Sequence, residues 1–586
     1  MKFLRNLLAA ILGCLIAFGV LFGMFVIFAA LIGNADKGVV VEENSILELS
    51  FTEPIKDYVG RDDTDPFASL WEEEVGLDDI LHTIKVAKDD SKIAGVSLTT
   101  SFLQAGLAQV QEIRNALLDF KSEGKFIYAH SDFYTQKDYY LATVADAMYL
   151  NPVGAMDFKG LATEILYFKD LQEKAGVKME VIRHGKYKSA VEPYLSNTMS
   201  PENRQQIKTL ITSLWDTMIA DIASSRNINE ADLNSIADTL GGRTPRYAMA
   251  SGLIDGNLHF DEYEALLVDK MGLDKKADIN YVDFNDYIQV AGKKSLRTGK
   301  DKIAVVYAQG EIYYGEGGKD YIGQGLMVST LQKAVESESV KAIVLRINSP
   351  GGSALVSDII WREVELAKEV KPVLVSFGNV AASGGYYIGV GGDKIFAEPT
   401  TITGSIGVFG TIPNAHELAG NIGINAEQVG TNKNSVDYSL FEPMSESFRD
   451  VVQEGVEDTY QVFLERVAAG RNMDITQVDS LAQGRVWSGV DAKENGLIDE
   501  LGNLDDAIAA AAEMVDLDTY GIRKYPKYKS DFERFMEDLG GAKAKIGAAL
   551  IQEEIGNEAF KVLKDFKKIT EQKGIQAKMP FSLTIK

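Results

Sequence analysis

The chain has 586 residues, of which 46% are hydrophobic and 25% charged, so it can build a core and is not a largely disordered protein. Sixty Lys and Arg against 85 Asp and Glu give a net charge of −25, which argues against a nucleic-acid partner, since phosphates require a basic face. The single cysteine, Cys14, excludes an internal disulfide framework, and the five histidines form no HExxH pair. We therefore expect neither a metal nor another cofactor.

The N-terminal segment predicts a membrane anchor. From Leu7 to Ile32 there is no charged residue and no proline, which is enough for a helix to cross a hydrocarbon core of about 30 Å. Lys2 and Arg5 precede this stretch, so the positive-inside rule keeps the N-terminus cytoplasmic and exports the rest. Cleavage near Ala35 is the alternative, but the apolar region of a signal peptide is usually about 7–15 residues. We expect a single uncleaved transmembrane helix within residues 1–36.

Internal similarity indicates that the body of the chain is duplicated. Shifted by 247 residues, Gln136–Ser189 aligns without a gap with Ser383–Val436, and nine pairs are identical. Further on, Gly242-Arg243 matches Gly484-Arg485. The expected parts are an N-terminal repeat over 45–290, a basic linker over 291–302, a C-terminal repeat over 303–524 and a helical extension over 525–586.

Each repeat predicts an α/β fold with a mostly parallel sheet, because short apolar, β-branched runs alternate with helical stretches. Long helical patterns then close each repeat. The expected strands are 93–98 and 126–130 in the first repeat and 303–308, 342–347 and 372–377 in the second, and the expected helices are 107–120, 201–225, 357–369 and 446–469.

Three glycine-rich turns follow strand-like runs in the second repeat. They are Asn348-Ser-Pro-Gly-Gly-Ser353, Ala381-Ala-Ser-Gly-Gly385 and Gly404-Ser-Ile-Gly407. Glycines there let a backbone approach a ligand closely and present N–H groups. The middle turn places Ser383 before a helix, a suitable position for an exposed nucleophile.

A base for Ser383 is indicated by comparing the two repeats. Lysine can act as a base when burial keeps its amine neutral, and Gly185-Lys-Tyr-Lys-Ser-Ala-Val-Glu-Pro193 offers Lys188 among small and apolar residues. In the alignment Lys188 faces Ser435, and Ser383 faces Gln136, so the two copies have kept complementary functions. His184 is the alternative base.

Here the chain resembles a known family. Tyr187-Lys-Ser-Ala-Val-Glu-Pro193, Ala381-Ala-Ser-Gly-Gly-Tyr386, Ser349-Pro-Gly-Gly352 and Thr403-Gly-Ser-Ile-Gly407 are similar to motifs of the long, duplicated signal peptide peptidase A type, peptidase family S49. The resemblance extends from Met1 to about Asp505. It implies two tandem Clp-protease/crotonase-like domains behind a single transmembrane helix.

The resemblance also implies roles for individual residues. Ser383 would be the nucleophile, Lys188 the general base and Ser405 the hydroxyl that holds the amine, while Gly352 and Gly384 would form the oxyanion hole. A base of this kind needs a pKa well below the usual value of about 10.4, so no carboxylate can pair with it. We therefore expect Glu192 to point away from Lys188.

The function implied is a serine endopeptidase that degrades signal peptides left in the membrane after preprotein processing. Its expected setting is the bacterial inner membrane, as a single-pass homotetramer with the catalytic body on the periplasmic side. Two alternatives from other classes are a crotonase-type acyl-CoA hydratase or isomerase, which shares glycine-rich oxyanion turns, and a non-catalytic membrane scaffold.

Overall fold

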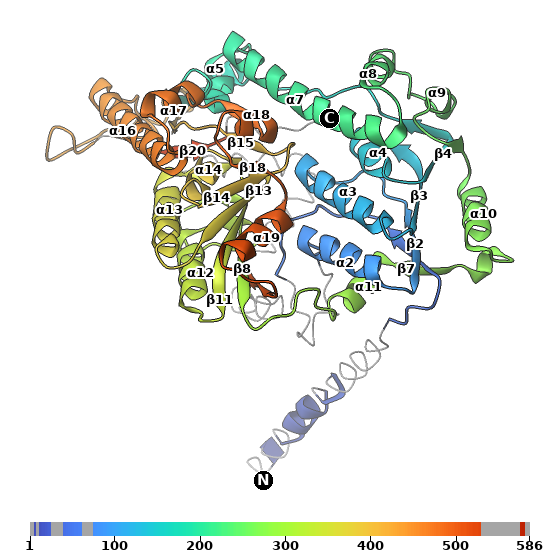
Figure 1. Cartoon of the computed structure of the whole chain (residues 1–586). Coiled ribbons are helices and arrows are strands. Elements are labelled where there is room, and N and C mark those ends of the chain that lie inside the picture. The colour runs from blue at the N-terminus through green and yellow to red at the C-terminus, as the bar shows by residue number, and fades with distance from the viewer. Residues whose placement is uncertain are drawn as a thin grey trace.

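The computed structural model describes residues 5–6, 11–20, 22–24, 39–60, 74–436, 438–528 and 575–579. Within these ranges the two repeats lie side by side, each built on its own sheet (Figure 1). Residues 11–20 are helical, but no helix of the described part is both long and apolar enough to cross a membrane. Half of the predicted anchor over Leu7–Ile32 lies outside the described residues, and the anchor stays a prediction.

The first repeat is built on a parallel sheet of six strands among the described residues. Successive side chains point to opposite faces, so Leu47 and Leu49 pack on one apolar cluster and Ile46 on another. Apolar residues therefore pack on both faces of this sheet. In sheet order the strands are β6 (Gly256–Asn257), β4 (Ala147–Met156), β3 (Phe126–Tyr134), β2 (Ile93–Leu98), β1 (Ser45–Leu49) and β7 (Asn280–Asp283).

Helices of the first repeat cover this sheet and extend beyond it. Residues of α2, α3 and α11 contribute to the larger apolar cluster, whereas α10 supplies Tyr263 and Leu267 to the opposite face. The helices are α2 (Leu77–Asp89), α3 (Leu107–Lys121), α4 (Gln136–Ala142), α5 (Lys169–Ala175), α6 (Glu192–Leu195), α7 (Pro201–Arg226), α8 (Glu230–Asp238), α9 (Pro245–Ala250), α10 (Phe260–Met271) and α11 (Phe284–Ala291), with 3₁₀ turns at Ser189–Val191 and Lys276–Asp278.

The second repeat has a larger sheet, with eight strands among the described residues. Its strands are β17 (Val486–Ser488), β15 (Ile402–Gly404), β13 (Val373–Ala382), β11 (Val340–Ser349), β8 (Lys302–Gln309) and β19 (Gly521–Tyr525) in sheet order, with β14 (Lys394–Ala397) and β18 (Glu500–Leu501) branching from β13. Its helices are α12 (Gln324–Glu336), α13 (Ala354–Lys368), α14 (Gly384–Gly389), α15 (His416–Asn421), α16 (Glu446–Arg471), α17 (Ile475–Leu481), α18 (Gly489–Glu494) and α19 (Leu504–Met514).

Helices α7 and α16, which close the two repeats, begin and end with the same capping residues. Ser200 and Ser445 cap their N-termini by accepting hydrogen bonds from backbone N–H groups. Asn227 and Asn472 end them in the left-handed conformation, with φ of 53° and 51°. The two helices predicted from the sequence are therefore present, each one or two residues longer than expected.

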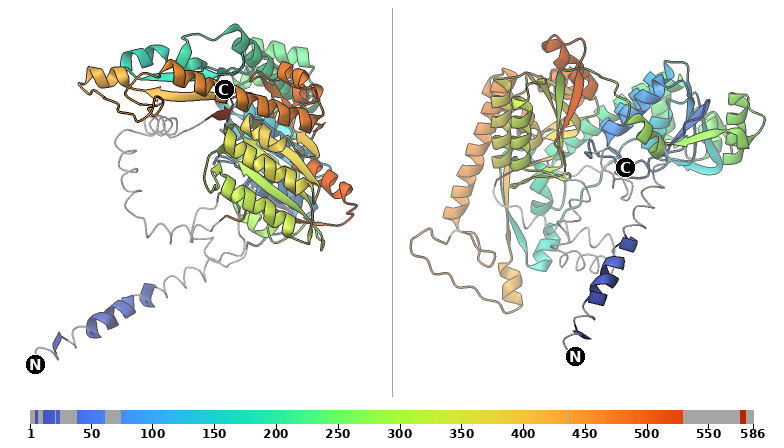
Figure 2. Two further views of the ribbon diagram at one scale, coloured as in Figure 1. Left: turned by 90° about the vertical axis from the view of Figure 1, so that its left-hand side faces the viewer. Right: turned by 90° about the horizontal axis from the view of Figure 1, so that it is seen from below.

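A third sheet joins the repeats. Its order is β10 (Tyr321–Ile322), β9 (Glu311–Ile312), β12 (Gly351–Ser353), β20 (Gln576–Lys578), β16 (Phe409–Asn414) and β5 (Lys178–Arg183). Strand β5 comes from the first repeat and pairs antiparallel with β16 of the second. Beyond this pair, Leu418 N–H donates to Gly176 O at 2.8 Å, so α5 and α15 lie together at the end of a projecting arm (Figure 2, right).

A buried ionic cluster also holds the repeats together. Arg346 on β11 of the second repeat donates to Asp57 Oδ2 at 2.7 Å and to Glu112 Oε1 at 2.5 Å, both in the first repeat. All three residues are at most 3% exposed. Because a buried charge is costly unless it is paired, this cluster fixes one relative placement of the repeats.

The described part of the C-terminal extension differs from the helical prediction. Residues 525–528 contain no helix, and Gln576–Lys578 form the strand β20 between β12 and β16. This short polar sequence has no strand pattern of its own, so its partners impose the conformation. The remainder of the extension lies outside the described residues.

Candidate active site

Ser383 lies at the turn between β13 and α14. Its φ of +55° is unusual for a residue with a side chain, and its backbone N–H donates to Gly404 O at 2.8 Å. A strained strand-to-helix turn of this kind directs the hydroxyl away from the strand, and such strain persists only where neighbours enforce it. The side chain is completely buried in this structure.

Lys188 reaches Ser383 from the first repeat. It follows β5, whose pairing with β16 carries the lysine turn into the second repeat. The turn is fixed by Arg183, which donates to Lys188 O at 3.1 Å, and by Tyr187 N–H, which donates to Gln483 O at 2.9 Å. As a result Lys188 Nζ lies 2.9 Å from Ser383 Oγ, although the residues are 195 positions apart.

Ser405 completes the surroundings of the amine. Its carbonyl oxygen and its Oγ lie 3.1 Å and 3.0 Å from Lys188 Nζ. A neutral amine has two N–H groups and one lone pair, so it can donate twice to Ser405 and accept from Ser383. The predicted residues Ser383, Lys188 and Ser405 are thus brought into one hydrogen-bonded group.

The electrostatics favour the neutral amine. Lys188 is completely buried, and burial lowers its pKa well below the ordinary lysine value. Glu192 faces away, as expected: its carboxylate accepts from Ser200 N–H at 3.0 Å and from Asn203 Nδ2 at 2.5 Å. Within the described part of the chain, no ion pair opposes the effect of burial on Lys188.

The two predicted oxyanion glycines lie at neighbouring turns. A Cβ on Gly352 would collide with Ile312 O, and a Cβ on Gly384 would lie 3.2 Å from Gly352 N and 2.6 Å from Ser357 Oγ. Side chains are therefore excluded from both positions. Two backbone N–H groups beside a serine are what an oxyanion hole requires.

Two other glycines make room for the lysine, a role that the sequence analysis did not assign to them. A Cβ on Gly484 would lie 2.6 Å from Lys188 Cα, and one on Gly407 would lie 3.3 Å from Lys188 Cδ. Gly484 belongs to the Gly-Arg pair that recurs in both repeats. That recurrence was the available signal, but it gave no hint of a contact with Lys188.

Gln206 on α7 is a second residue that the sequence did not single out. Its Nε2 donates to Tyr187 O and to Ser189 Oγ, both at 3.0 Å, and its Oε1 accepts from Val486 N–H at 3.3 Å. The side chain therefore connects the lysine turn to a strand of the second repeat. A glutamine within a helical pattern carries no signal for such a contact.

The histidines do not form an alternative base at this serine. The ring of His184 stacks on Tyr460 with centroids 4.1 Å apart, and His416 Nδ1 lies 2.7 Å from Phe441 O. Within the described chain, Ser383 Oγ has hydrogen-bond partners in Lys188 Nζ and in Gly407 O, the latter at 3.4 Å. This geometry favours lysine over His184.

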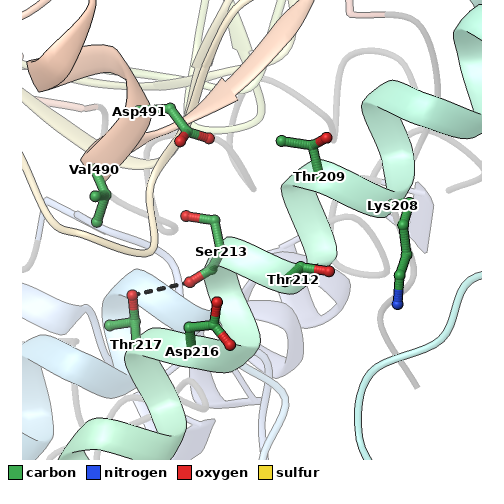
Figure 3. A pocket seen from close by; sticks show the side chains of 8 residues that line it. All are labelled: Lys208, Thr209, Thr212, Ser213, Asp216, Thr217, Val490 and Asp491. Atoms are coloured by element: carbon green, nitrogen blue, oxygen red, sulfur yellow. Dashed lines mark hydrogen bonds between the residues drawn. The ribbon is translucent and has the colours of Figure 1, made fainter.

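A separate pocket of about 480 Å³ opens between α7 and α18 (Figure 3). Lys208, Thr212 and Asp216 line it from α7, and Asp491 lines it from α18. None of the eight lining residues belongs to the Ser383 group. The pocket is therefore distinct from the candidate active site.

A buried amine that contacts a serine, next to paired backbone donors, is the geometry of a serine hydrolase. The chain belongs to peptidase family S49, whose sequence profile matches residues 119–274 and 365–518. It is similar to Protease 4 of Haemophilus influenzae, with 39% identity over 75% of this chain and 73% of that protein. It is also similar to the chloroplastic serine protease SPPA of Arabidopsis thaliana, with 32% identity over 78% of this chain and 68% of that protein.

These matches confirm the predicted family and a serine protease, in place of a crotonase-type enzyme or a scaffold. The mixed α/β fold with tandem family matches is confirmed as well. A solved ClpP1 variant of Listeria monocytogenes aligns with 35% of this chain and 94% of that chain, at 16% identity and a TM-score of 0.24. That score is too low to establish a common fold, so the Clp-like domain type stays a prediction.

Proposed function

We propose that this protein is a membrane-anchored endopeptidase that uses a Ser383–Lys188 dyad to degrade signal peptides left in the membrane after preprotein processing. The observation that carries the proposal is the 2.9 Å approach of Lys188 Nζ to Ser383 Oγ in a fully buried setting. Burial lowers the pKa of the amine, so Lys188 can be neutral when it meets the serine hydroxyl.

In the proposed mechanism, Ser383 Oγ attacks the scissile carbonyl carbon and its proton passes to Lys188 Nζ. The N–H groups of Gly352 and Gly384 stabilise the oxyanion, a contribution of about 3–4 kcal/mol for each donor. The lysinium then protonates the leaving amine, and a water molecule hydrolyses the acyl-serine ester. Ser405 keeps the amine oriented during both proton transfers.

The cellular setting belongs to the same proposal. The uncharged stretch from Leu7 to Ile32, preceded by Lys2 and Arg5, supports a single anchor in the bacterial inner membrane. The catalytic body then lies on the periplasmic side of that membrane. The proposed assembly is a homotetramer, as the family resemblance implies, and cross-linking in membranes would measure it.

The test compares detergent-solubilised wild type with Ser383→Ala, Lys188→Ala and the control Lys186→Ala on a synthetic signal peptide. Lys186 is exposed and lies two residues from Lys188 in the same turn, so its loss removes a charge without touching the dyad. We expect both dyad variants to lose activity and Lys186→Ala to keep it. The wild-type kcat/KM should rise with pH as Lys188 loses its proton. Retained activity in Lys188→Ala would refute the dyad.

A further inference from the structure

One short segment of the second repeat contacts both sides of the amine site. This bridging segment comprises residues 483–485, between α17 and β17. Gln483 O accepts a hydrogen bond from Tyr187 N–H of the lysine turn at 2.9 Å. Arg485 O accepts one from Ser405 N–H at 2.6 Å. The position of the bridging segment therefore sets the spacing between the lysine turn and the Ser405 turn.

The bridging segment is held in place by a tyrosine hydroxyl. Gln483 has a φ of +54°, a conformation that persists only where its surroundings enforce it. Its backbone N–H donates to Tyr460 Oη at 3.2 Å. Tyr460 Oη donates in turn to Asp479 Oδ1 at 2.5 Å, and Gln483 Nε2 donates to the same oxygen at 2.6 Å. The hydroxyl thus ties the bridging segment to α16 and α17, which lie side by side (Figure 1).

Tyr460 also contacts the lysine turn directly. Its ring, in a residue that is 4% exposed, stacks on the ring of His184 with centroids 4.1 Å apart. His184 precedes Gly185, where a Cβ would lie 2.5 Å from Gln483 O. The ring therefore packs against the lysine turn while the hydroxyl holds the bridging segment that this turn touches.

The first repeat contains the same pair of helices. Matching the N-caps of α7 with α16 and of α8 with α17 places Trp215 at the position of Tyr460 and Asn234 at that of Asp479. Trp215 Nε1 donates to Asn234 Oδ1 at 2.7 Å. The hydrogen bond between the two helices therefore occurs in both repeats and does not require a tyrosine.

The connection to the following segment differs between the repeats. The Gly-Arg pairs place Gly241 at the position of Gln483, and Gly241 N–H donates to Ile236 O at 2.7 Å. An indole N–H cannot accept a hydrogen bond, whereas a phenol can donate and accept at once. Of the two repeats, the one that carries the serine has the hydroxyl that reaches this segment.

We propose that Tyr460 is a positioning residue for the proposed Ser383–Lys188 chemistry, on which this inference rests. Its hydroxyl fixes the bridging segment, and the bridging segment fixes the lysine turn where Lys188 Nζ meets Ser383 Oγ. Tyr460 acts through these contacts and not on the reacting atoms. Loss of its hydroxyl should therefore lower kcat and kcat/KM together, with KM unchanged.

A displaced lysine turn should also alter the pH profile. Burial holds the pKa of Lys188 well below the ordinary lysine value. A turn that is no longer fixed admits water to the amine, which raises this pKa and moves the rise of kcat/KM to higher pH. A smaller folded fraction would instead lower the rate equally at every pH and leave the profile in place.

The experiment measures kcat, KM and the pH profile of kcat/KM on the synthetic signal peptide, with thermal unfolding of the same samples. Detergent-solubilised wild type, Tyr460→Phe and Lys188→Ala are compared. Tyr460→Phe removes one oxygen and keeps the ring that stacks on His184. The matched control is Tyr139→Phe in the core of the first repeat, where the buried hydroxyl donates to Leu253 O at 3.1 Å.

We expect Tyr460→Phe to lower kcat by about 10-fold to 10²-fold, since a misplacement of 1 Å costs on the order of 10²-fold. Its profile should move to higher pH, whereas Tyr139→Phe should keep the wild-type kcat and profile. An unchanged kcat in Tyr460→Phe, or a loss without a shifted profile, would overturn the positioning role and leave the proposed function standing. Wild type that cuts nothing, or Lys188→Ala that keeps its activity, would overturn the dyad and this inference together.

Discussion

Substituting alanine for Gly484 should displace Lys188. The new Cβ would lie 2.6 Å from N, Cα and Cβ of Lys188, whereas ordinary contacts are 3.4–4 Å. Because these atoms belong to the lysine turn itself, no rotation of a side chain relieves the collision, and the turn must shift by about 1 Å. A misplacement of that size costs on the order of 10²-fold in rate. The positive φ of 81° adds about 1–2 kcal/mol of strain in the folded state.

The assay is kcat and KM on a fluorogenic peptide, with thermal unfolding measured on the same samples. Gly124→Ala is the matched control, because Gly124 has a φ of +80° and a Cβ there would meet nothing within 4 Å. Both variants should lose stability from backbone strain, Gly484→Ala more because of the added collision, but only Gly484→Ala should lose kcat. Equal activity in the two variants would refute the reasoning.

Three further predictions concern the surroundings of the site. Lys188→Met should raise the free energy of unfolding at pH 7. Burial lowers the pKa of the Lys188 amine, so at this pH the unfolded chain binds a proton there that the folded chain does not, and this difference destabilises the wild type. In urea titrations the gain in stability should shrink as the pH approaches the pKa of an unfolded lysine, about 10.4. Gln206→Ala should leave buried polar groups of the lysine turn unpaired, which lowers kcat and costs about 1–3 kcal/mol of stability. The control Gln205→Ala, on the exposed side of α7, should change neither kcat nor stability appreciably. Arg346→Met should destabilise the fold by about 3–5 kcal/mol in urea unfolding, because it leaves the buried carboxylates of Asp57 and Glu112 without their cationic partner. A loss of stability no larger than that of Arg246→Met, at an exposed arginine, would contradict this account.

Much of the fold could be predicted from local patterns. The strand at Ile93–Leu98 was placed to the residue, and the long helices had recognisable caps, because apolar periodicity and capping residues act over a few neighbouring positions. Ser383 and Lys188 were identified by comparing the repeats and by a family resemblance. Spacing alone could not have paired them, since they meet only when β5 docks on β16.

The features that escaped prediction depend on tertiary contacts. Gly484 and Gln206 matter because of what packs against them, and a single sequence does not record such neighbours. The segment around Ala577 has no alternating pattern and adopts a strand because β12 and β16 offer two open edges. Its position between these strands could therefore not be predicted from local sequence.

The division of the site between two repeats also bears on how the protein is made. A ribosome adds about 5–20 residues per second, so roughly 10–40 s separate the synthesis of Lys188 from that of Ser383, 195 positions later. The first repeat can fold during this interval, but it carries an amine without a hydroxyl to activate. On the proposed Ser383–Lys188 chemistry, a nascent chain has no proteolytic activity until the second repeat has been completed and has docked on the first.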